Sequence, residues 1–346
     1  MNSLERVSMV INHQEPDRVP VYPMVNSISM KYTGIDYREW TQDPVKCAEA
    51  ILKATDELDL DVICTLTDLS VEAADWGLKI KYPTNQAAGP DNERLIKEKE
   101  DYKKIAVLDP CKTPRMSKHI ELAKLLCAAK GEEKPVVGFV FGPLGILSML
   151  RSLDYLMKDM IKDPKIVYAA LENITETIIK FSLDLIDAGC HAIMFDTLYA
   201  SKTIMRPSMW DEFEGVYIER AAKAVHDAGA MVMIHNCGGG IYYDIQIERM
   251  HPEAISFLYL PPDCKTMEEL KEKYGNQTTL IGHIDPGFLM VCSEEELREQ
   301  CREQIDTYKK DGGFILATGC EYPAPLDDHF AKVMVEEAKT YGVYEK

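Results

Sequence analysis

Eight short segments rich in apolar and β-branched residues recur along the chain, separated by longer stretches with helical periodicity. Their near-continuous hydrophobicity is typical of parallel strands that are covered on both faces. Eight such strands alternating with helices predict an α/β fold of the (β/α)8 TIM barrel type. The predicted strands are 19–23, 60–66, 135–142, 191–196, 230–235, 255–260, 279–284 and 313–319.

Three of the intervening stretches carry clear helix signals. The stretch 165–189 has apolar residues three and four positions apart and ends at a glycine. Ser293 with Glu296, and Thr266 with Glu269, have the spacing of capping boxes at helix starts. An open doubly wound sheet is the main structural alternative, but no glycine-rich nucleotide-binding motif follows the first strands.

The chain has 346 residues, which exceeds the roughly 250 that a barrel of this type needs. We assign the surplus to an N-terminal helical extension and to a polar insertion, 80–116, that forms a lid or an extra helical layer. Because no linker or internal repeat interrupts the pattern, residues 1–346 are predicted to form a single barrel domain.

Charge and composition argue against several classes of function. The net charge is −18 and no basic stripe is present, so a nucleic-acid partner is not expected. No apolar run reaches the roughly 18 residues of a membrane span. The N-terminus lacks the apolar core of a signal peptide, so a cytoplasmic protein is expected. The ten cysteines are scattered, which predicts reduced thiols.

Polar residues follow the carboxyl ends of the predicted strands, which is where a barrel carries its active site. Asp196 is predicted to be catalytic. Glu321 is a candidate proton donor, a group supporting a ligand, or a loop carboxylate. A functional role and helix capping explain Asp68 equally well. The strand-end residues are Asn26, Thr67, Asp68, Asp196, His235, Cys237, Asp285 and Cys320.

His235 and Cys237 are two residues apart, so in extended chain they point to the same side. Glycines 238–240 would let the chain turn sharply beside a bound group. With Cys320 from the last strand, one imidazole and two thiolates make the three-ligand set, with one open position, that catalytic zinc uses. The same residues would also suit a pocket wall or the core, and the pattern alone does not decide.

Seven motifs spread over nearly the whole chain carry a family resemblance: 15-EPDRVPVYPMVN-26, 67-TDLSVEAADWG-77, 141-FGPLGILSMLR-151, 188-AGCHAIMFDTLYAS-201, 235-HNCGG-239, 281-IGHIDP-286 and 319-GCEYP-323. Together they resemble the uroporphyrinogen decarboxylase superfamily, and more closely its zinc- and corrinoid-dependent methyltransferase branch. The resemblance implies a (β/α)8 barrel, zinc bound by His235, Cys237 and Cys320, and a partner protein that carries cobalamin.

Two reactions of that branch are candidates. One moves a methyl group from methylcobamide to a thiol such as coenzyme M, and a formally neutral zinc dithiolate favours it. The other takes a methyl group from a methylated donor, such as an aromatic methyl ether, to cob(I)alamin. Apolar and aromatic side chains near the strand ends favour this O-demethylase. The predicted substrate-binding residues are Tyr22, Met24, Asn26, Asp68, Phe195, Tyr199, Trp210 and Tyr322.

Two further functions remain as alternatives. Uroporphyrinogen decarboxylase itself grips a substrate with several carboxylates through an arginine-rich N-terminal loop, whereas 22–34 contains no arginine here. A non-catalytic zinc-bearing scaffold would need a fourth protein ligand, for which Glu321 and Cys64 are the candidates.

Overall fold

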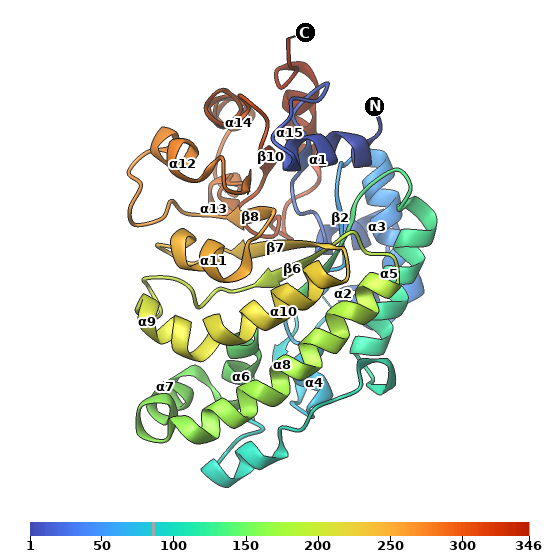
Figure 1. The fold of residues 1–346 in the computed structure, drawn as a ribbon. Helices are drawn as coiled ribbons and strands as arrows, with labels where there is room; N and C mark the ends of the chain where they lie inside the picture. Colours follow the sequence, from blue (N-terminus) through green and yellow to red (C-terminus); the bar gives the residue numbers. More distant parts are fainter. Residues whose placement is uncertain (85–86, 346) are drawn as a thin grey trace.

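The computed structural model describes residues 1–84 and 87–345, and an eight-stranded parallel sheet forms its centre (Figure 1). The spatial order β1-β10-β9-β8-β7-β6-β5-β2 makes sequence neighbours spatial neighbours, as in a barrel. All eight predicted strands are present, and the (β/α)8 fold is confirmed. They are β1 (Val21–Tyr22), β2 (Ile63–Cys64), β5 (Val136–Phe141), β6 (Ala192–Asp196), β7 (Met231–Asn236), β8 (Ala254–Phe257), β9 (Thr279–Ile281) and β10 (Phe314–Ala317).

The seam between β1 and β2 is held by a side chain as well as by the backbone. The backbone N–H of Asp61, just before β2, donates to the Val21 carbonyl oxygen at 3.1 Å. The Val21 N–H in turn donates to Asp61 Oδ2 at 2.8 Å. The buried carboxylate of Asp61 therefore ties the first strand to the second where no ladder pairing joins them.

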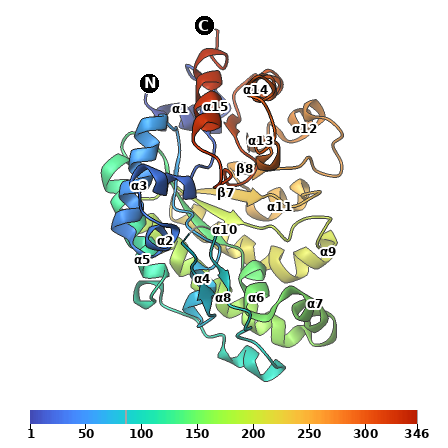
Figure 2. The same ribbon diagram turned by 180° about the vertical axis from the view of Figure 1, so that it is seen from behind.

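Helices surround the strands, as α8, α10 and α11 do in Figure 1 and α3 and α15 do in the reverse view of Figure 2. None of the helices in the described ranges is both long enough and apolar enough to cross a membrane. The α-helices are α1 (Ser3–Ile11), α2 (Tyr37–Gln42), α3 (Pro44–Leu58), α4 (Val71–Asp75), α5 (Met116–Lys130), α6 (Pro143–Arg151), α7 (Leu153–Lys162), α8 (Pro164–Asp187), α9 (Pro207–Trp210), α10 (Val216–Asp227), α11 (Tyr243–Met250), α12 (Met267–Tyr274), α13 (Pro286–Leu289), α14 (Glu294–Tyr308) and α15 (His329–Thr340). The shorter turns are the 3-10 helices η1 (Ser27–Tyr32), η2 (Lys99–Lys104) and η3 (Pro110–Lys112) and the π-helical η4 (Asp211–Gly215).

The predicted helix signals are reproduced with one difference. Helix α8 is followed by Gly189 at φ +107°, a backbone region that favours glycine. Both halves of the Ser293–Glu296 capping box form at the start of α14. At α12, Thr266 accepts from the Glu269 N–H at 3.3 Å, but the Glu269 carboxylate accepts from the Lys265 N–H instead, so that box is incomplete.

The buried apolar residues of the strands belong to two separate layers. One fills the barrel interior and contains Met194, Met233 and Ile315. The other lies between strands and helices and contains Phe195 and Ile234. Because successive strand residues point to opposite faces, this alternation decides which side chains near a strand end can reach the interior.

The polar insertion 80–116 folds mostly as irregular chain. Strands β3 (Ile80–Lys81) and β4 (Gly89–Pro90) pair antiparallel, and η2 and η3 follow. The Ala88 N–H donates to the Tyr37 hydroxyl at 3.3 Å, which attaches the hairpin to α2. Within the insertion, the described residues ahead of α5 form only short 3-10 helices. They therefore add no helical layer. Its action as a lid stays a prediction.

Candidate metal centre and active-site cavity

Three side chains with metal-binding atoms meet at the carboxyl end of the barrel. His235 is on β7, Cys237 follows that strand directly, and Cys320 follows β10. One nitrogen or sulfur atom from each lies within 4.8 Å of the other two. The fold therefore brings together the three residues that the sequence pattern singled out, although β7 and β10 are far apart along the chain.

Glycines allow the loops around these residues to approach closely. A Cβ on Gly319 would lie 2.6 Å from Leu258 Cδ1 and 2.9 Å from the Phe257 carbonyl oxygen, so the chain before Cys320 passes β8 only as glycine. A Cβ on Gly238 would lie 2.7 Å from the Ser201 side chain. These glycines make room for neighbouring protein. That glycines 238–240 also turn the chain beside a bound group stays a prediction.

The imidazole of His235 is oriented by a serine on the next strand. Ser256 of β8 lies 3.0 Å from His235 Nδ1, and both side chains are buried. A hydrogen bond at Nδ1 fixes the ring and leaves Nε2 as the nitrogen available to a metal. Sequence reasoning missed Ser256, because only the β7–β8 register places it opposite His235.

The two cysteine sulfurs lie close enough to change each other's ionisation. The Cys237 thiol donates to Cys320, which raises the pKa of Cys237 and lowers the pKa of Cys320. A nearby His235 stabilises the Cys320 thiolate further. Metal ligation requires both sulfurs as thiolates, so a cation that binds here would displace a thiol proton to solvent.

The donor set fits zinc. One imidazole nitrogen and two thiolate sulfurs are the soft ligands that zinc prefers, and three protein ligands leave one position open. Among the described residues, no further His, Cys, Asp or Glu joins this group. Glu321 Oε1 instead accepts from the Ser27 N–H at 2.9 Å. Cys64 is fully buried against Tyr22. A closed four-ligand structural site is therefore not formed by these candidates.

A cavity of about 260 Å³ opens beside the three ligands. Its walls come from strand ends on several sides of the barrel, from α6 and from the hairpin of the insertion. Most of the lining is apolar, and its acidic side chains are Asp68, Asp196 and Glu321. The described residues that line it are Tyr22, Met24, Tyr37, Cys64, Leu66, Thr67, Asp68, Leu69, Ala87, Ala88, Gly89, Pro90, Phe139, Met149, Met194, Asp196, Leu198, His235, Cys237, Cys320 and Glu321.

Comparison with known proteins identifies the family. The model of the uroporphyrinogen decarboxylase (URO-D) family matches residues 2–341. The chain belongs to the uroporphyrinogen decarboxylase family. It is 24% identical to the uroporphyrinogen decarboxylase of Sulfurimonas denitrificans over 84% of each chain. It is 22% identical to the methylcobamide:CoM methyltransferase MtbA of Methanosarcina mazei over 97% of each chain. A solved methyltransferase structure from Methanosarcina mazei shares the fold, with a TM-score of 0.84 at 20% identity and 99% of both chains covered.

In this member of the family, five of the predicted catalytic and substrate-binding residues line the cavity. They are Tyr22, Met24, Asp68, Asp196 and Glu321. Burial is the main reason that the pKa of Asp196 is raised to about 6, and it also raises the pKa of Glu321. Both acids therefore keep a proton to higher pH than an exposed carboxyl group does.

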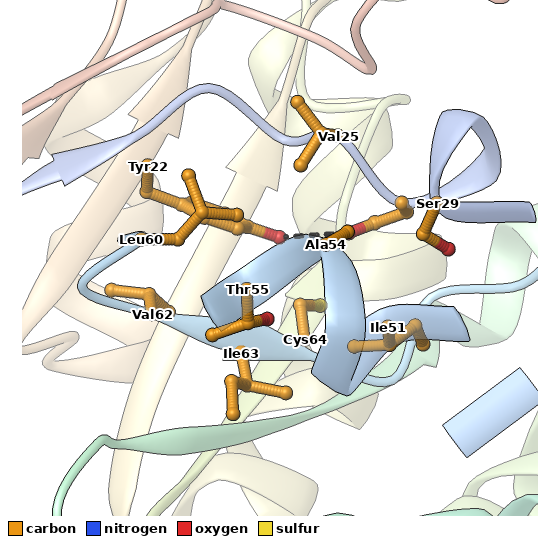
Figure 3. Close-up of a pocket in the computed structure, with 11 residues that line it drawn as sticks. Tyr22, Val25, Ser29, Ile51, Ala54, Thr55, Leu60, Val62, Ile63 and Cys64 are labelled. Carbon is orange, nitrogen blue, oxygen red and sulfur yellow. Dashed lines mark hydrogen bonds between the residues drawn. The ribbon is translucent and has the colours of Figure 1, made fainter. Parts of the chain in front are cut away.

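The five other predicted substrate-binding residues do not line this cavity. Phe195 follows an inward-facing residue on β6 and so faces the helices. The Trp210 indole N–H donates to Glu214 at 2.7 Å, inside the helical layer. The hydroxyl groups of Tyr199 and Tyr322 bond to Ser148 and to the Asp327 carbonyl oxygen. Asn26 lines a separate cavity of about 10 Å³ behind Tyr22, shown in Figure 3.

Asp68 is held by an arginine that sequence reasoning missed. Arg115 Nη2 donates to Asp68 Oδ2 at 2.6 Å, and the Ser70 N–H donates to Oδ1 at 2.9 Å. Arg115 also donates to the Thr41 carbonyl oxygen at 2.7 Å. These contacts make Asp68 a structural anchor at the cavity wall. It does not cap α4, whose N-cap residue is Ser70 and which has no side-chain cap bond. Nothing in the local sequence pairs it with a residue 47 positions away.

Phe139 and Met194 also line the cavity, and strand alternation could have identified both as interior residues. Met149 on α6 and Leu69 before α4 had no such signal, because their approach depends on how helices and loops pack over the strand ends.

Glu72 of α4 is not among the residues that line the cavity, and its carboxyl group affects stability. Its buried carboxyl group accepts from the Phe141 N–H at 2.9 Å, and burial raises its pKa to about 8. Between pH 4.5 and 8 the unfolded chain ionises this group while the folded chain keeps it protonated. The fold is therefore destabilised as pH rises through that window, by on the order of 1 kcal/mol per pH unit.

We expect Glu72→Gln to flatten this pH dependence, since an amide accepts the same hydrogen bond without ionising. Urea unfolding midpoints from pH 5 to 9 measure the effect. Glu57→Gln, at an exposed position of α3, is the matched control and should follow the wild type. Parallel pH profiles of Glu72→Gln and wild type would contradict the expectation.

Proposed function

We propose that this family member is a zinc-dependent methyltransferase that removes a methyl group from a methoxylated aromatic compound and passes it to cobalamin on a partner corrinoid protein. The observation that carries the proposal is the three-ligand group of His235, Cys237 and Cys320 at the wall of a largely apolar cavity. A cavity of about 260 Å³ is of the size that holds a single substituted ring.

His235 Nε2 and the sulfurs of Cys237 and Cys320 would hold the zinc ion. When bound there, zinc supplies a Lewis acid that stabilises negative charge on a departing oxygen. The apolar wall formed by Met24, Phe139 and Met194 would orient the ring and exclude water from it. Asp196 and Glu321 line the same cavity and are the proposed donors of the proton that the phenolate product takes up.

Transfer of a methyl group from methylcobamide to a thiol is the second candidate. The 22% identity to a methylcobamide:CoM methyltransferase over almost the full chain favours it. The decarboxylase activity named for other relatives is disfavoured, because the cavity is small for a tetrapyrrole and the lining residues of the described chain include no arginine or lysine. A non-catalytic scaffold is disfavoured because the fourth metal position has no protein ligand among the described residues.

The test mixes the zinc-loaded protein with a cob(I)alamin carrier and a panel of aryl methyl ethers, methylamines and methyl thioethers. Formation of methyl-cobalt, followed by its visible spectrum, is expected with the ethers alone. Protein freed of metal by a chelator serves as the control. Consumption of methyl-cobalt by a thiol, with no reaction of any ether, would instead support the second candidate.

Ser256→Ala tests the orientation of the proposed ligand His235. Losing the hydroxyl group frees the imidazole ring, and we expect zinc affinity to fall about 10- to 100-fold. Competition with a chromogenic chelator measures the affinity. Ser182→Ala is the matched control, since that serine is equally buried but bonds to the Ile178 carbonyl oxygen within α8. An unchanged affinity in Ser256→Ala would show that the serine does not position the ligand.

A further inference from the structure

The described lining of the active-site cavity contains acidic side chains but, apart from His235, no basic one. Asp68, Asp196 and Glu321 line the cavity, and the described lining residues include no arginine or lysine. The zinc site that we propose adds no net charge, because a divalent cation is balanced by two thiolates. An anionic group entering this largely apolar cavity would give up its contacts with water without gaining a cation to pair with, and an unpaired buried charge is strongly unfavourable.

Arg115 does not supply the missing positive charge. Its guanidinium group is paired with Asp68 and the Thr41 carbonyl oxygen, and only 8% of its side chain is exposed. Since Asp68 and Arg115 neutralise each other, freeing the arginine for a ligand would leave a buried carboxylate unpaired. Such a rearrangement is strongly unfavourable.

The two tyrosine hydroxyl groups at the cavity wall are engaged, whereas the Thr67 hydroxyl group has no hydrogen-bond partner among the described residues. The Tyr22 hydroxyl donates to Asn26 Oδ1 at 3.4 Å, and the Tyr37 hydroxyl donates to the Thr67 carbonyl oxygen at 3.1 Å. The described wall therefore offers a substrate mainly apolar contact and no positively charged partner, which suits an uncharged ring and disfavours a carboxylate or sulfonate.

We propose that the cavity selects an uncharged substrate with an apolar body and excludes substrates that carry a carboxylate or sulfonate group. The proposal deepens the proposed function by naming its substrate class, and it rests on that function only for the identity of the transferred group. An uncharged methoxyphenol fits this class. A methoxybenzoate and 2-mercaptoethanesulfonate do not.

Two pairs of compounds that differ in charge at nearly constant shape test the selection. The first pair is 4-hydroxy-3-methoxybenzamide and 4-hydroxy-3-methoxybenzoate, and the second is 2-mercaptoethanesulfonamide and 2-mercaptoethanesulfonate. Calorimetric titration of the full-length, zinc-loaded chain should show the uncharged member binding at least about 10-fold more tightly in each pair. Equal or tighter binding of either anion would overturn the proposal, as would failure of both uncharged compounds to bind.

A charge introduced at the wall provides a second measurement. Met149 lines the cavity from α6 and is half-buried, so a longer polar side chain can be accommodated there. Met149→Lys is expected to improve binding of the benzoate relative to the benzamide by about 10-fold, whereas the matched Met149→Gln should leave the ratio unchanged. An identical ratio in the two variants would count against charge as the basis of selection.

The same titrations separate this proposal from the proposed function. Binding of the benzamide without formation of methyl-cobalt on the carrier, or binding of the sulfonamide thiol alone, would reject the demethylase and leave the charge selection standing. Methyl transfer from the benzoate in preference to the benzamide would support the demethylase and reject the charge selection.

Discussion

Cys320→Ala is expected to abolish stoichiometric zinc binding and to lower the rate of methyl transfer by at least about 10³-fold, since several kcal/mol of transition-state stabilisation would be lost. The reason lies in the geometry of the ligand group. Cys320 is the one member that β10 contributes, and its sulfur lies within 4.8 Å of the donor atoms from His235 and Cys237. Without it, two ligands from one strand end remain, too few for a stable zinc site.

Elemental analysis of the purified variant and the methyl-cobalt assay measure the two effects. Cys292→Ala is the control, because that thiol is half-buried like Cys320 but lies between α13 and α14, outside the ligand group. It should retain zinc and activity. Retention of one zinc ion per chain and of full activity in Cys320→Ala would reject the metal centre itself.

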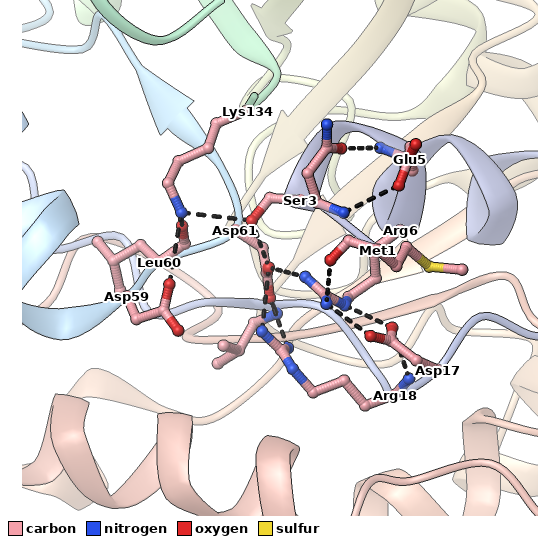
Figure 4. A network of polar contacts seen from close by, with 12 residues as sticks. Met1, Ser3, Glu5, Arg6, Asp17, Arg18, Asp59, Leu60, Asp61 and Lys134 are labelled. Atoms are coloured by element: carbon pink, nitrogen blue, oxygen red, sulfur yellow. Dashed lines mark hydrogen bonds and ion pairs between the residues drawn. The ribbon is translucent and has the colours of Figure 1, made fainter. Parts of the chain in front are cut away.

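Asp61→Asn is expected to destabilise the fold by about 3–5 kcal/mol, because it leaves buried positive charge uncompensated. Figure 4 shows the network at the amino end of the barrel. Asp61 is fully buried and accepts from Arg6 Nη1 at 2.9 Å and from Arg18 Nη1 at 2.7 Å. It also accepts from Ser3 Oγ and from the Val21 N–H, each at 2.8 Å. One carboxylate thus joins α1, the chain before β1, and β2.

Urea unfolding followed by circular dichroism measures the loss. Asp227→Asn removes a carboxylate of the same kind from an exposed pair with Lys223, where the side chains are 72% and 64% exposed for Lys223 and Asp227. An ion pair of that kind contributes at most about 1 kcal/mol, so this control should unfold near the wild-type midpoint. Equal effects of the two substitutions would mean that the network does not hold the seam between β1 and β2.

Strand positions were predictable because hydrophobicity along the chain is a local property. Segments such as 135–142 and 191–196 are apolar on both faces, which suits only strands buried between a barrel interior and surrounding helices. The corresponding strands β5 and β6 are buried throughout. The capping box at Ser293 was predictable for the same reason, since its partners are three residues apart.

The direction of side chains and their contacts with residues far away along the chain were harder to predict from the sequence than the strand positions. Phe195 and Met194 are adjacent in sequence, yet only Met194 reaches the cavity, and the phase of the strand decides which one does. Applying strand alternation would have corrected Phe195. No local rule would have found Ser256 beside His235 or Arg115 beside Asp68, because these contacts depend on strand register and on the path of an insertion.

The sequence by itself determined the barrel, its eight strands and the three residues with metal-binding chemistry at strand ends, because periodicity and residue type are written along the chain. The tertiary structure alone decided that His235, Cys237 and Cys320 meet, since residues remote in sequence come together only when the strands close into a ring. It also decided which charged side chains line the cavity. The sequence carries 39 basic residues, and folding leaves none of them among the described residues of the cavity wall.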